Sequence, residues 1–172
     1  HIVMAWLLGN SVDIKENLKA RLISNILLDN SGSPLLKALE TTPLANSPSP
    51  MCGLEDSMKE MCFVCGVEGS ESKHTQEVEK LILETLQTTA KKGVSNEQII
   101  ASLDQIELAQ REITGSSYPY GLQLILSCMS GAIHRGDPKE LLDIESVLTD
   151  LREEIQSPNF LKDTIEKLFI QN

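Results

Sequence analysis

The hydrophobic pattern of the chain begins with a short apolar run that predicts a β-strand. Ile2–Leu8 (IVMAWLL) is continuous, and Gly9-Asn10 ends it. A strand buried on both faces fits this run, although periodicity alone does not distinguish it from a helical turn. The chain starts at a histidine, directly inside this predicted strand, which suggests that the sequence is a piece of a longer protein.

The next segment, Ile14–Thr42, predicts an amphipathic helix, a polar turn and a second, shorter helix. Its apolar residues recur at i, i+4, i+5 and i+8, a spacing that gathers side chains on one helical face. In the turn we expect Gly32 to take a positive φ, Ser33 to cap the second helix and Pro34 to fill its first position. Such a helix pair needs a sheet to lie on. The apolar residues are Leu18, Leu22, Ile23, Ile26, Leu35, Leu36 and Leu39.

Two later segments are candidates for that sheet. Pro43–Asp56 has three prolines in eight positions, which excludes a central strand and leaves an extended edge or a loop. Glu60–Glu68 (EMCFVCGVE) is the clearest strand, because its side chains alternate between two faces. One face holds Met61, Phe63, Cys65 and Val67, and the other holds Cys62 and Val64.

From Thr75 onward the periodicity is helical. Lys91-Lys92-Gly93 predicts the end of one helix, and Ser95-Asn96-Glu97-Gln98 is a capping box that starts the next. Tyr120–His134 is almost wholly apolar, so we expect it to be a helix buried among the others. Asp137-Pro138 and Ser157-Pro158 predict the starts of two further helices. The last of them carries Phe160, Leu161, Ile165, Leu168 and Phe169.

This order of elements predicts one domain over residues 1–172 with an α+β fold. A small antiparallel sheet, incomplete in this chain, is covered by about seven helices. Too few strands are present to cover so many amphipathic helices, and a missing strand on either side of the chain would repair this.

Composition and charge exclude some classes of binding partner for the domain. The net charge of −10 argues against nucleic-acid binding through phosphate neutralisation. No apolar run approaches the roughly 20 residues of a membrane-spanning helix. Four cysteines without regular spacing do not form a secreted disulfide framework, which favours a reducing intracellular compartment such as the cytoplasm.

Two motifs have the spacing of metal or redox sites, and both have a structural explanation. Cys62 and Cys65 are spaced as C-x-x-C, but residues i and i+3 of a strand point to opposite faces, so we interpret them as buried apolar cysteines. His74-Thr75-Gln76-Glu77 matches the start of the inverted zinc motif H-x-x-E-H, and Val78 stands where the second histidine belongs. A single histidine does not supply the three protein ligands of a catalytic zinc.

The sequence contains no self-sufficient catalytic site. It has no G-x-S-x-G elbow, no phosphate-binding G-x-x-x-x-G-K-[ST] loop and no G-x-G-x-x-G. Tyr118 and Tyr120 could face a cleft, or they could tie a loop to the core through a hydroxyl hydrogen bond. We therefore expect no catalytic residue and no metal ligand in this chain.

Several stretches in order along the whole chain resemble one family. They include LLDNSGSPLLKALETT, GLEDSMKEMCFVCGVEGSE, YPYGLQLILSCMSGAIHRGDPKELL and SPNFLKDTIEKLFIQN. Gly136-Asp137-Pro138 and Asn159-Phe160-Leu161 contribute most to the likeness. On these residues the chain resembles the presequence proteases of the pitrilysin/insulinase superfamily, which are inverted-zincin metallopeptidases.

The resemblance implies a place within a larger enzyme. Such enzymes have four related α+β domains in two halves that close around a peptide-degradation chamber, and this chain looks like the second, non-catalytic domain. The family's zinc ligands and catalytic glutamate lie in the first domain, before His1, and its catalytic arginine and tyrosine lie in the fourth. None of these roles passes to a residue here, Tyr118 and Tyr120 included. The family's next strand would begin just beyond Asn172.

The resemblance also implies one substrate-binding segment. In the insulin-degrading relatives an extended edge of the second domain binds the N-terminal segment of the substrate by strand addition. Collinear placement puts that edge at Met51, Cys52, Gly53 and Leu54. A proline-rich approach leaves an unpaired edge, and Gly53 permits close approach of a peptide backbone. The relatives are glycine-rich here, whereas this chain has one glycine.

The resulting hypothesis is a non-catalytic domain that shapes the chamber and positions short unstructured peptides. Zinc would be bound by the preceding domain of the same polypeptide. The C-terminal half of that polypeptide would be the second partner of this domain. An alternative is a helix-rich interaction or scaffold module without peptidase activity, and a third possibility is thiol redox chemistry at Cys62 and Cys65. An exposed apolar patch is expected for either of the first two.

Overall fold

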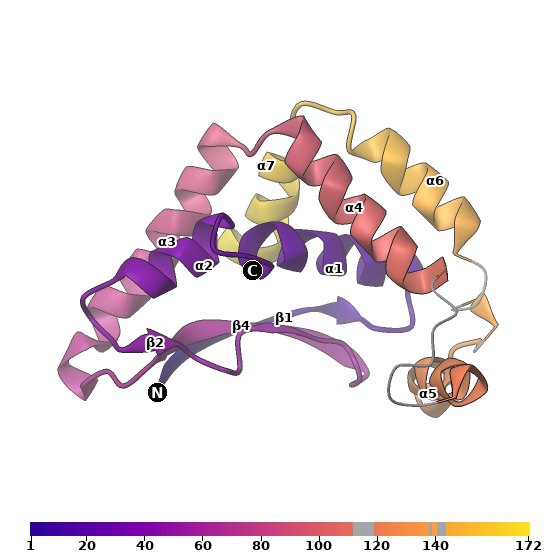
Figure 1. Cartoon of the computed structure of the whole chain (residues 1–172), viewed down its shortest axis with the longest axis horizontal. Coiled ribbons are helices and arrows are strands. Elements are labelled where there is room, and N and C mark those ends of the chain that lie inside the picture. The colour runs from indigo at the N-terminus through magenta and orange to yellow at the C-terminus, as the bar shows by residue number, and fades with distance from the viewer. Residues whose placement is uncertain (112–118, 138, 141–143) are drawn as a thin grey trace.

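The structure is a computed structural model that describes residues 1–111, 119–137, 139–140 and 144–172. A four-stranded antiparallel sheet forms one layer, and most helices lie on one of its faces (Figure 1). The strands are β1 (Ile2–Asn10), β2 (Ser47–Pro48), β3 (Gly53–Glu55) and β4 (Glu60–Glu68). The helices are α1 (Ile14–Leu28), α2 (Pro34–Thr41), α3 (Thr75–Lys92), α4 (Asn96–Arg111), α5 (Tyr120–Ile133), α6 (Glu145–Glu154) and α7 (Phe160–Ile165), with the short turns η1 (Ser72–His74) and η3 (Glu166–Ile170). The predicted α+β fold is confirmed.

The two long strands form the centre of the sheet. β1 and β4 pair along their whole length, from Ile2 opposite Val67 to Asn10 opposite Glu60, and β2 and β3 both pair with the other edge of β4. α1 and α3 pack against this sheet, and α4 and α6 pack against α1. The helices thus build a second and a third layer over one face (Figure 1).

The inner face of the sheet is the centre of the hydrophobic core. All four side chains that the pattern of β4 placed on one face are completely buried: Met61, Phe63, Cys65 and Val67. Phe63 contacts Phe169 of η3 at 4.9 Å between ring centroids, and Trp6 contacts Phe169 at 5.5 Å. The Trp6 indole Nε1 donates to the Phe169 carbonyl oxygen at 3.0 Å, so its polar atom has a partner in the core.

The burial predicted for β1 is wrong. The sequence suggested a strand buried on both faces, but its residues alternate between the core and the open face of the sheet. Trp6 and Leu8 are buried, whereas Val3 and Leu7 are 40% and 63% exposed. The helices cover one face only, so an apolar strand can keep half of its side chains outside the core.

Side-chain caps start α1 and α4, whereas no side-chain hydrogen bond within the described residues caps the start of α2, α3, α6 or α7. Asp13 Oδ1 accepts the Glu16 N–H at 3.0 Å and starts α1, and the Gln98 N–H donates to Ser95 Oγ at 3.2 Å as predicted for α4. α2 begins with Pro34 at its first position. Gly32 corrects a prediction, because it is not among the residues with positive φ. The turn before α2 is formed instead by Asn30, whose Oδ1 accepts the Gly32 N–H at 2.9 Å.

The prediction for α5 is also wrong, because this almost wholly apolar helix is not buried. Most of its large side chains are exposed, although Leu124 is half-buried, and the helix lies beside one end of the sheet (Figure 1). The predicted helix start at Asp137-Pro138 involves Pro138, which lies outside the described residues, and so does the segment 141–143 that follows. The final helical segment is confirmed, since Phe160, Leu161 and Ile165 of α7 and Leu168 and Phe169 of η3 are buried.

Glu154 of α6 provides a pH-dependent link to α1. Lys15 Nζ lies 2.7 Å from one of its carboxylate oxygens, and Lys19 Nζ lies 2.6 Å from the other. The hydrogen bonds from Lys15 and Lys19 lower the pKa of Glu154 below its ordinary value of 4.5. A lowered pKa in the folded state stabilises the fold above the unfolded pKa, and this contribution is lost as pH falls through the folded pKa.

We therefore predict that Glu154→Gln reduces the loss of stability on acidification. The measurement is the urea midpoint at about pH 7 and about pH 3. The difference between the two midpoints should be smaller in Glu154→Gln than in the unsubstituted chain, and the exposed neighbour Glu153→Gln should behave like the unsubstituted chain. The same acid dependence in all three proteins would contradict the prediction.

Candidate functional site

The candidate site is the face of the sheet opposite the helices, together with the edge that β3 forms. Side chains on this outer face come from alternate positions of β1 and β4 and are mainly apolar. They are Val3, Ala5, Leu7, Cys62 and Val64. The apolar run of β1 contained no signal for this face, because every position in it is hydrophobic.

The edge of the sheet beside β4 is interrupted in its middle. β2 and β3 are two short stretches that pair with different parts of β4, and residues 49–52 form a turn between them. Gly66 of β4 lies opposite this turn. Its carbonyl oxygen accepts the Ser49 N–H at 2.9 Å, and its N–H donates to Cys52 Sγ at 3.3 Å. The Cys52 sulfur therefore accepts the hydrogen bond that a backbone carbonyl oxygen of a paired strand would accept.

The predicted edge segment is divided between this turn and β3. Met51 and Cys52 lie in or beside the turn, and Gly53 and Leu54 belong to β3. Leu54 pairs with Phe63 and packs against the core, whereas Met51 is 60% exposed. Among the described residues β3 pairs with β4 alone, so its other side presents backbone groups to the surroundings. The four residues are thus brought to one edge.

Gly53 has a conformation that few other residues adopt. Its φ is +142°, and a Cβ placed on it would meet no atom within 4 Å. The backbone conformation therefore favours glycine, while the space beside it is open. An open, bare backbone at a sheet edge is a place where an extended peptide can approach closely.

The C-x-x-C cysteines lie on opposite faces of β4, as predicted. Cys65 is completely buried on the inner face, and Cys62 is half-buried on the outer face. The interpretation as buried apolar cysteines is thus right for Cys65 and wrong for Cys62. Burial, followed by the nearby Cys52 thiol, raises the pKa of Cys65 far above the ordinary thiol range. A thiol-redox pair needs neighbouring sulfurs and a lowered thiol pKa, whereas these two sulfurs lie on opposite faces and the pKa of Cys65 is raised.

We predict a large difference in reactivity between these two thiols. N-ethylmaleimide should modify Cys62 in the folded chain more than about tenfold faster than Cys65, because a thiolate must form and be accessible to react. Peptide mass spectrometry after timed quenching measures both rates, and in urea the two should become similar. Equal rates in the folded chain, or a Cys62–Cys65 disulfide after mild oxidation, would contradict the geometry.

The remaining sequence motifs have local structural roles. His74 Nδ1 lies 2.6 Å from Glu77 Oε2 at the start of α3, and His134 Nε2 lies 3.0 Å from the Ser57 carbonyl oxygen. Tyr120 begins α5 and is exposed, and Tyr118 lies outside the described residues. Within the described part of the chain, no three histidine, cysteine or acidic side chains gather as a metal site.

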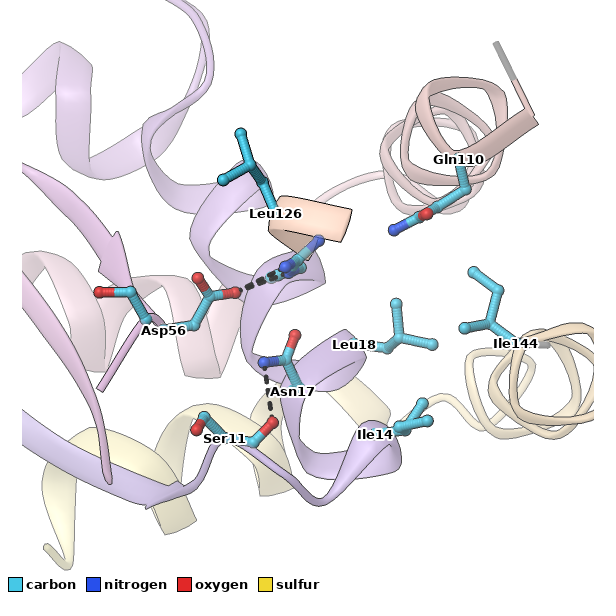
Figure 2. A pocket seen from close by; sticks show the side chains of 10 residues that line it. Ser11, Ile14, Asn17, Leu18, Asp56, Gln110, Leu126 and Ile144 are labelled. Atoms are coloured by element: carbon cyan, nitrogen blue, oxygen red, sulfur yellow. Dashed lines mark hydrogen bonds and ion pairs between the residues drawn. The ribbon is translucent and has the colours of Figure 1, made fainter. Parts of the chain in front are cut away.

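A cavity of about 200 Å³ lies between α1 and the ends of neighbouring helices. Figure 2 shows the side chains that line it. Ile14 and Leu18 face Ile144 across it, and Leu126 of α5 lies at its border. Arg21 binds Asp56 through two nitrogens, both 2.8 Å from the same carboxylate oxygen. The ion pair ties α1 to the segment after β3. Its two charges neutralise each other.

Comparison with known proteins identifies the family. The model described as "Peptidase M16 inactive domain" matches residues 1–106. The mitochondrial presequence protease of Yarrowia lipolytica is 31% identical over 98% of this chain, and that of Mus musculus is 32% identical over 99%. Protein HypA of Clostridium perfringens is 28% identical over 97%. The chain spans only 16–17% of the length of these relatives.

Two solved structures have the same fold. A proposed zinc protease of Bordetella pertussis superimposes with a TM-score of 0.67 at 15% identity, covering 95% of this chain and 83% of the other. The inactive peptidase domain of a proposed zinc protease of Bordetella parapertussis gives 0.64 at 16% identity, covering 95% and 82%. None of the described helices is long and apolar enough to cross a membrane. The family match over residues 1–106 and the presequence-protease relatives show that the chain belongs to the peptidase M16 inactive-domain family.

Proposed function

We propose that this chain is the chamber-forming and substrate-positioning domain of a zinc-dependent peptidase that degrades short unstructured peptides. The observation that carries the proposal is the open edge at β3 beside an apolar sheet face that no described helix covers. Family membership supports it, since the family is described as an inactive peptidase domain. We call the longer protein that would contain this chain the parent polypeptide.

The proposed role is to bind and orient a peptide rather than to cleave it. Zinc, held by the preceding domain of the parent polypeptide, would supply an activated water. The C-terminal half would close the chamber from the other side and exclude folded proteins. The contribution of this chain is to keep an extended substrate in register, which removes part of the entropic cost of reaction.

Strand addition at β3 gives that role a physical basis. An extended peptide laid along β3 can pair its backbone with the free side of the strand, which binds peptides with little dependence on their sequence. Gly53 leaves the backbone bare where the peptide approaches, and its surroundings are open. Met51, two residues before Gly53, offers an exposed apolar side chain near this position, whereas Leu54 packs against the core.

The test is Gly53→Val in the parent polypeptide. We expect the KM for a short unstructured peptide to rise by about tenfold with little change in kcat, because binding is weakened and the zinc site is untouched. Gly93→Val is the matched control. Gly93 also has a positive φ, +71°, with nothing within 4 Å of an added Cβ, but it ends α3. The control should show similar backbone strain and an unchanged KM.

An unchanged KM in Gly53→Val would remove Met51, Cys52, Gly53 and Leu54 from the proposed binding site. An equal rise of KM in both variants would assign the effect to general strain, and the binding role of β3 would then be wrong. Thermal unfolding of both variants shows that each is folded at the assay temperature.

A further strand and a reducing compartment belong to the same proposal. Asn172 Nδ2 donates to the Leu7 carbonyl oxygen at 2.7 Å, so this residue lies beside β1. Among the described residues β1 pairs with β4 alone, and a strand following Asn172 would complete the sheet there.

All four cysteines are free thiols, which supports a reducing intracellular compartment.

A further inference from the structure

α5 displays a stripe of large apolar side chains on one side. They recur at i, i+3, i+4, i+7 and i+11, which places them along one helical face. All are between 39% and 65% exposed: Leu122, Ile125, Leu126, Met129 and Ile133. We call these five residues the α5 stripe. An apolar stripe of this size on a surface indicates an interaction site.

Most of the α5 stripe is left exposed by the domain: Leu126 lies at the border of the cavity beside α1, and Ile125 and Ile133 are 61% and 65% exposed. Leu124 and Cys128 are half-buried, and Gly131 is buried. After the helix, His134 Nε2 lies 3.0 Å from the Ser57 carbonyl oxygen, and Gly136 packs against Val12. These contacts of the segment with the domain thus lie at Leu126 and after the end of the helix, and they leave the five stripe residues 39–65% exposed.

The chemistry of the stripe restricts what can cover it. Residues 120–133 contain no charged side chain, in a chain with 23% charged residues. An ion pair cannot contribute to docking on this face, and a charged partner group would lose its hydration without compensation. The occupant must therefore present an uncharged, apolar surface.

The size of the stripe favours an occupant on the same polypeptide. A helix of 14 residues is about 21 Å long, so one face of it buries only a few hundred Å². Stable complexes between separate chains bury about 1,200–2,000 Å² in total, which two copies of α5 side by side do not reach. Contacts between domains of one chain can be smaller, because the connection supplies an effective concentration on the order of millimolar.

We propose that the α5 stripe docks this domain onto an uncharged apolar surface of another domain of the parent polypeptide. The inference rests on that part of the proposed function which places the chain in a longer protein. The relatives support it, since this chain spans 16–17% of their length. Docking through α5 would fix the orientation of β3 relative to the neighbouring domain.

The test compares two positions of equal exposure in the parent polypeptide. Ile125 of the stripe is 61% exposed in this domain, and Leu108 of α4 is 66% exposed. N-ethylmaleimide should modify Ile125→Cys at least about tenfold more slowly than Leu108→Cys, because the stripe is covered. Equal rates would overturn the proposal. Protection that disappears on dilution, together with a dimeric mass, would also overturn it, since the occupant would be a second copy.

A second pair of variants measures the consequence of breaking the contact. Ile125→Asp should lower the Tm of the parent polypeptide by several degrees and increase cleavage by a protease between its domains, whereas Leu108→Asp should do neither. Unchanged Tm and proteolysis in Ile125→Asp would overturn the proposal. Zinc content and peptide hydrolysis are separate readouts: a parent polypeptide without zinc that still protects Ile125→Cys supports α5 docking and contradicts only the proposed function.

Discussion

Phe63→Ala is expected to remove about 3–5 kcal/mol from the free energy of unfolding, a large part of the about 5–15 kcal/mol that stabilises an ordinary domain. Phe63 is completely buried at the centre of β4. Its ring lies 4.9 Å from that of Phe169 and 6.1 Å from that of Trp6, between centroids. Truncation leaves a cavity between the sheet and η3 and removes both aromatic contacts.

Urea unfolding of this chain measures the effect. Leu108→Ala provides the control, because Leu108 is 66% exposed on α4 and such surface substitutions change stability by about 0.5 kcal/mol or less. A loss below about 1 kcal/mol in Phe63→Ala would mean that the aromatic cluster is not the centre of the core.

Gly66→Ala should destabilise the sheet by about 1–3 kcal/mol or more, although it adds a single methyl group. A Cβ at Gly66 would clash with the Ile2 carbonyl oxygen and lie 2.6 Å from Val3 Cα. Both are backbone atoms of the paired strand β1, so neither can move without disturbing the β1–β4 ladder. The same residue also carries the hydrogen bonds that hold Ser49 and Cys52 at the edge.

The result is read from the urea midpoint and from hydrogen exchange of the β1 amides. Gly121→Ala is the matched control, since an added Cβ in α5 meets nothing within 4 Å and alanine favours a helix. It should leave stability unchanged or slightly raised. Unchanged protection of the β1 amides in Gly66→Ala would contradict the close approach of the two strands.

Local patterns predicted most of the fold. The alternation of Glu60–Glu68 gave both the bounds of β4 and its buried face, and Lys91-Lys92-Gly93 marked the end of α3. Periodicity and capping act over a few residues, so they can be found in a single sequence. The edge at Met51–Leu54 was placed by the family resemblance, and the proline-rich sequence before it predicted an edge or a loop.

The wrong burial predictions for β1 and α5 share one physical cause. β1 and α5 are apolar on all sides, and such a pattern shows that a segment avoids water without showing what covers it. Leu7 and Ile125 are both exposed because the described domain covers only one side of each element. Gly32 was assigned a positive φ from its place in a turn, but the Asn30 side chain closes that turn instead.

Zinc content and peptide hydrolysis by the parent polypeptide test the central claim most directly. We predict about one zinc per polypeptide, bound outside residues 1–172, and hydrolysis of short unstructured peptides that ends when a chelator removes the metal. A parent polypeptide that binds no zinc and cleaves no peptide would contradict it. The fold would stand, and the chain would then act as an interaction or scaffold module.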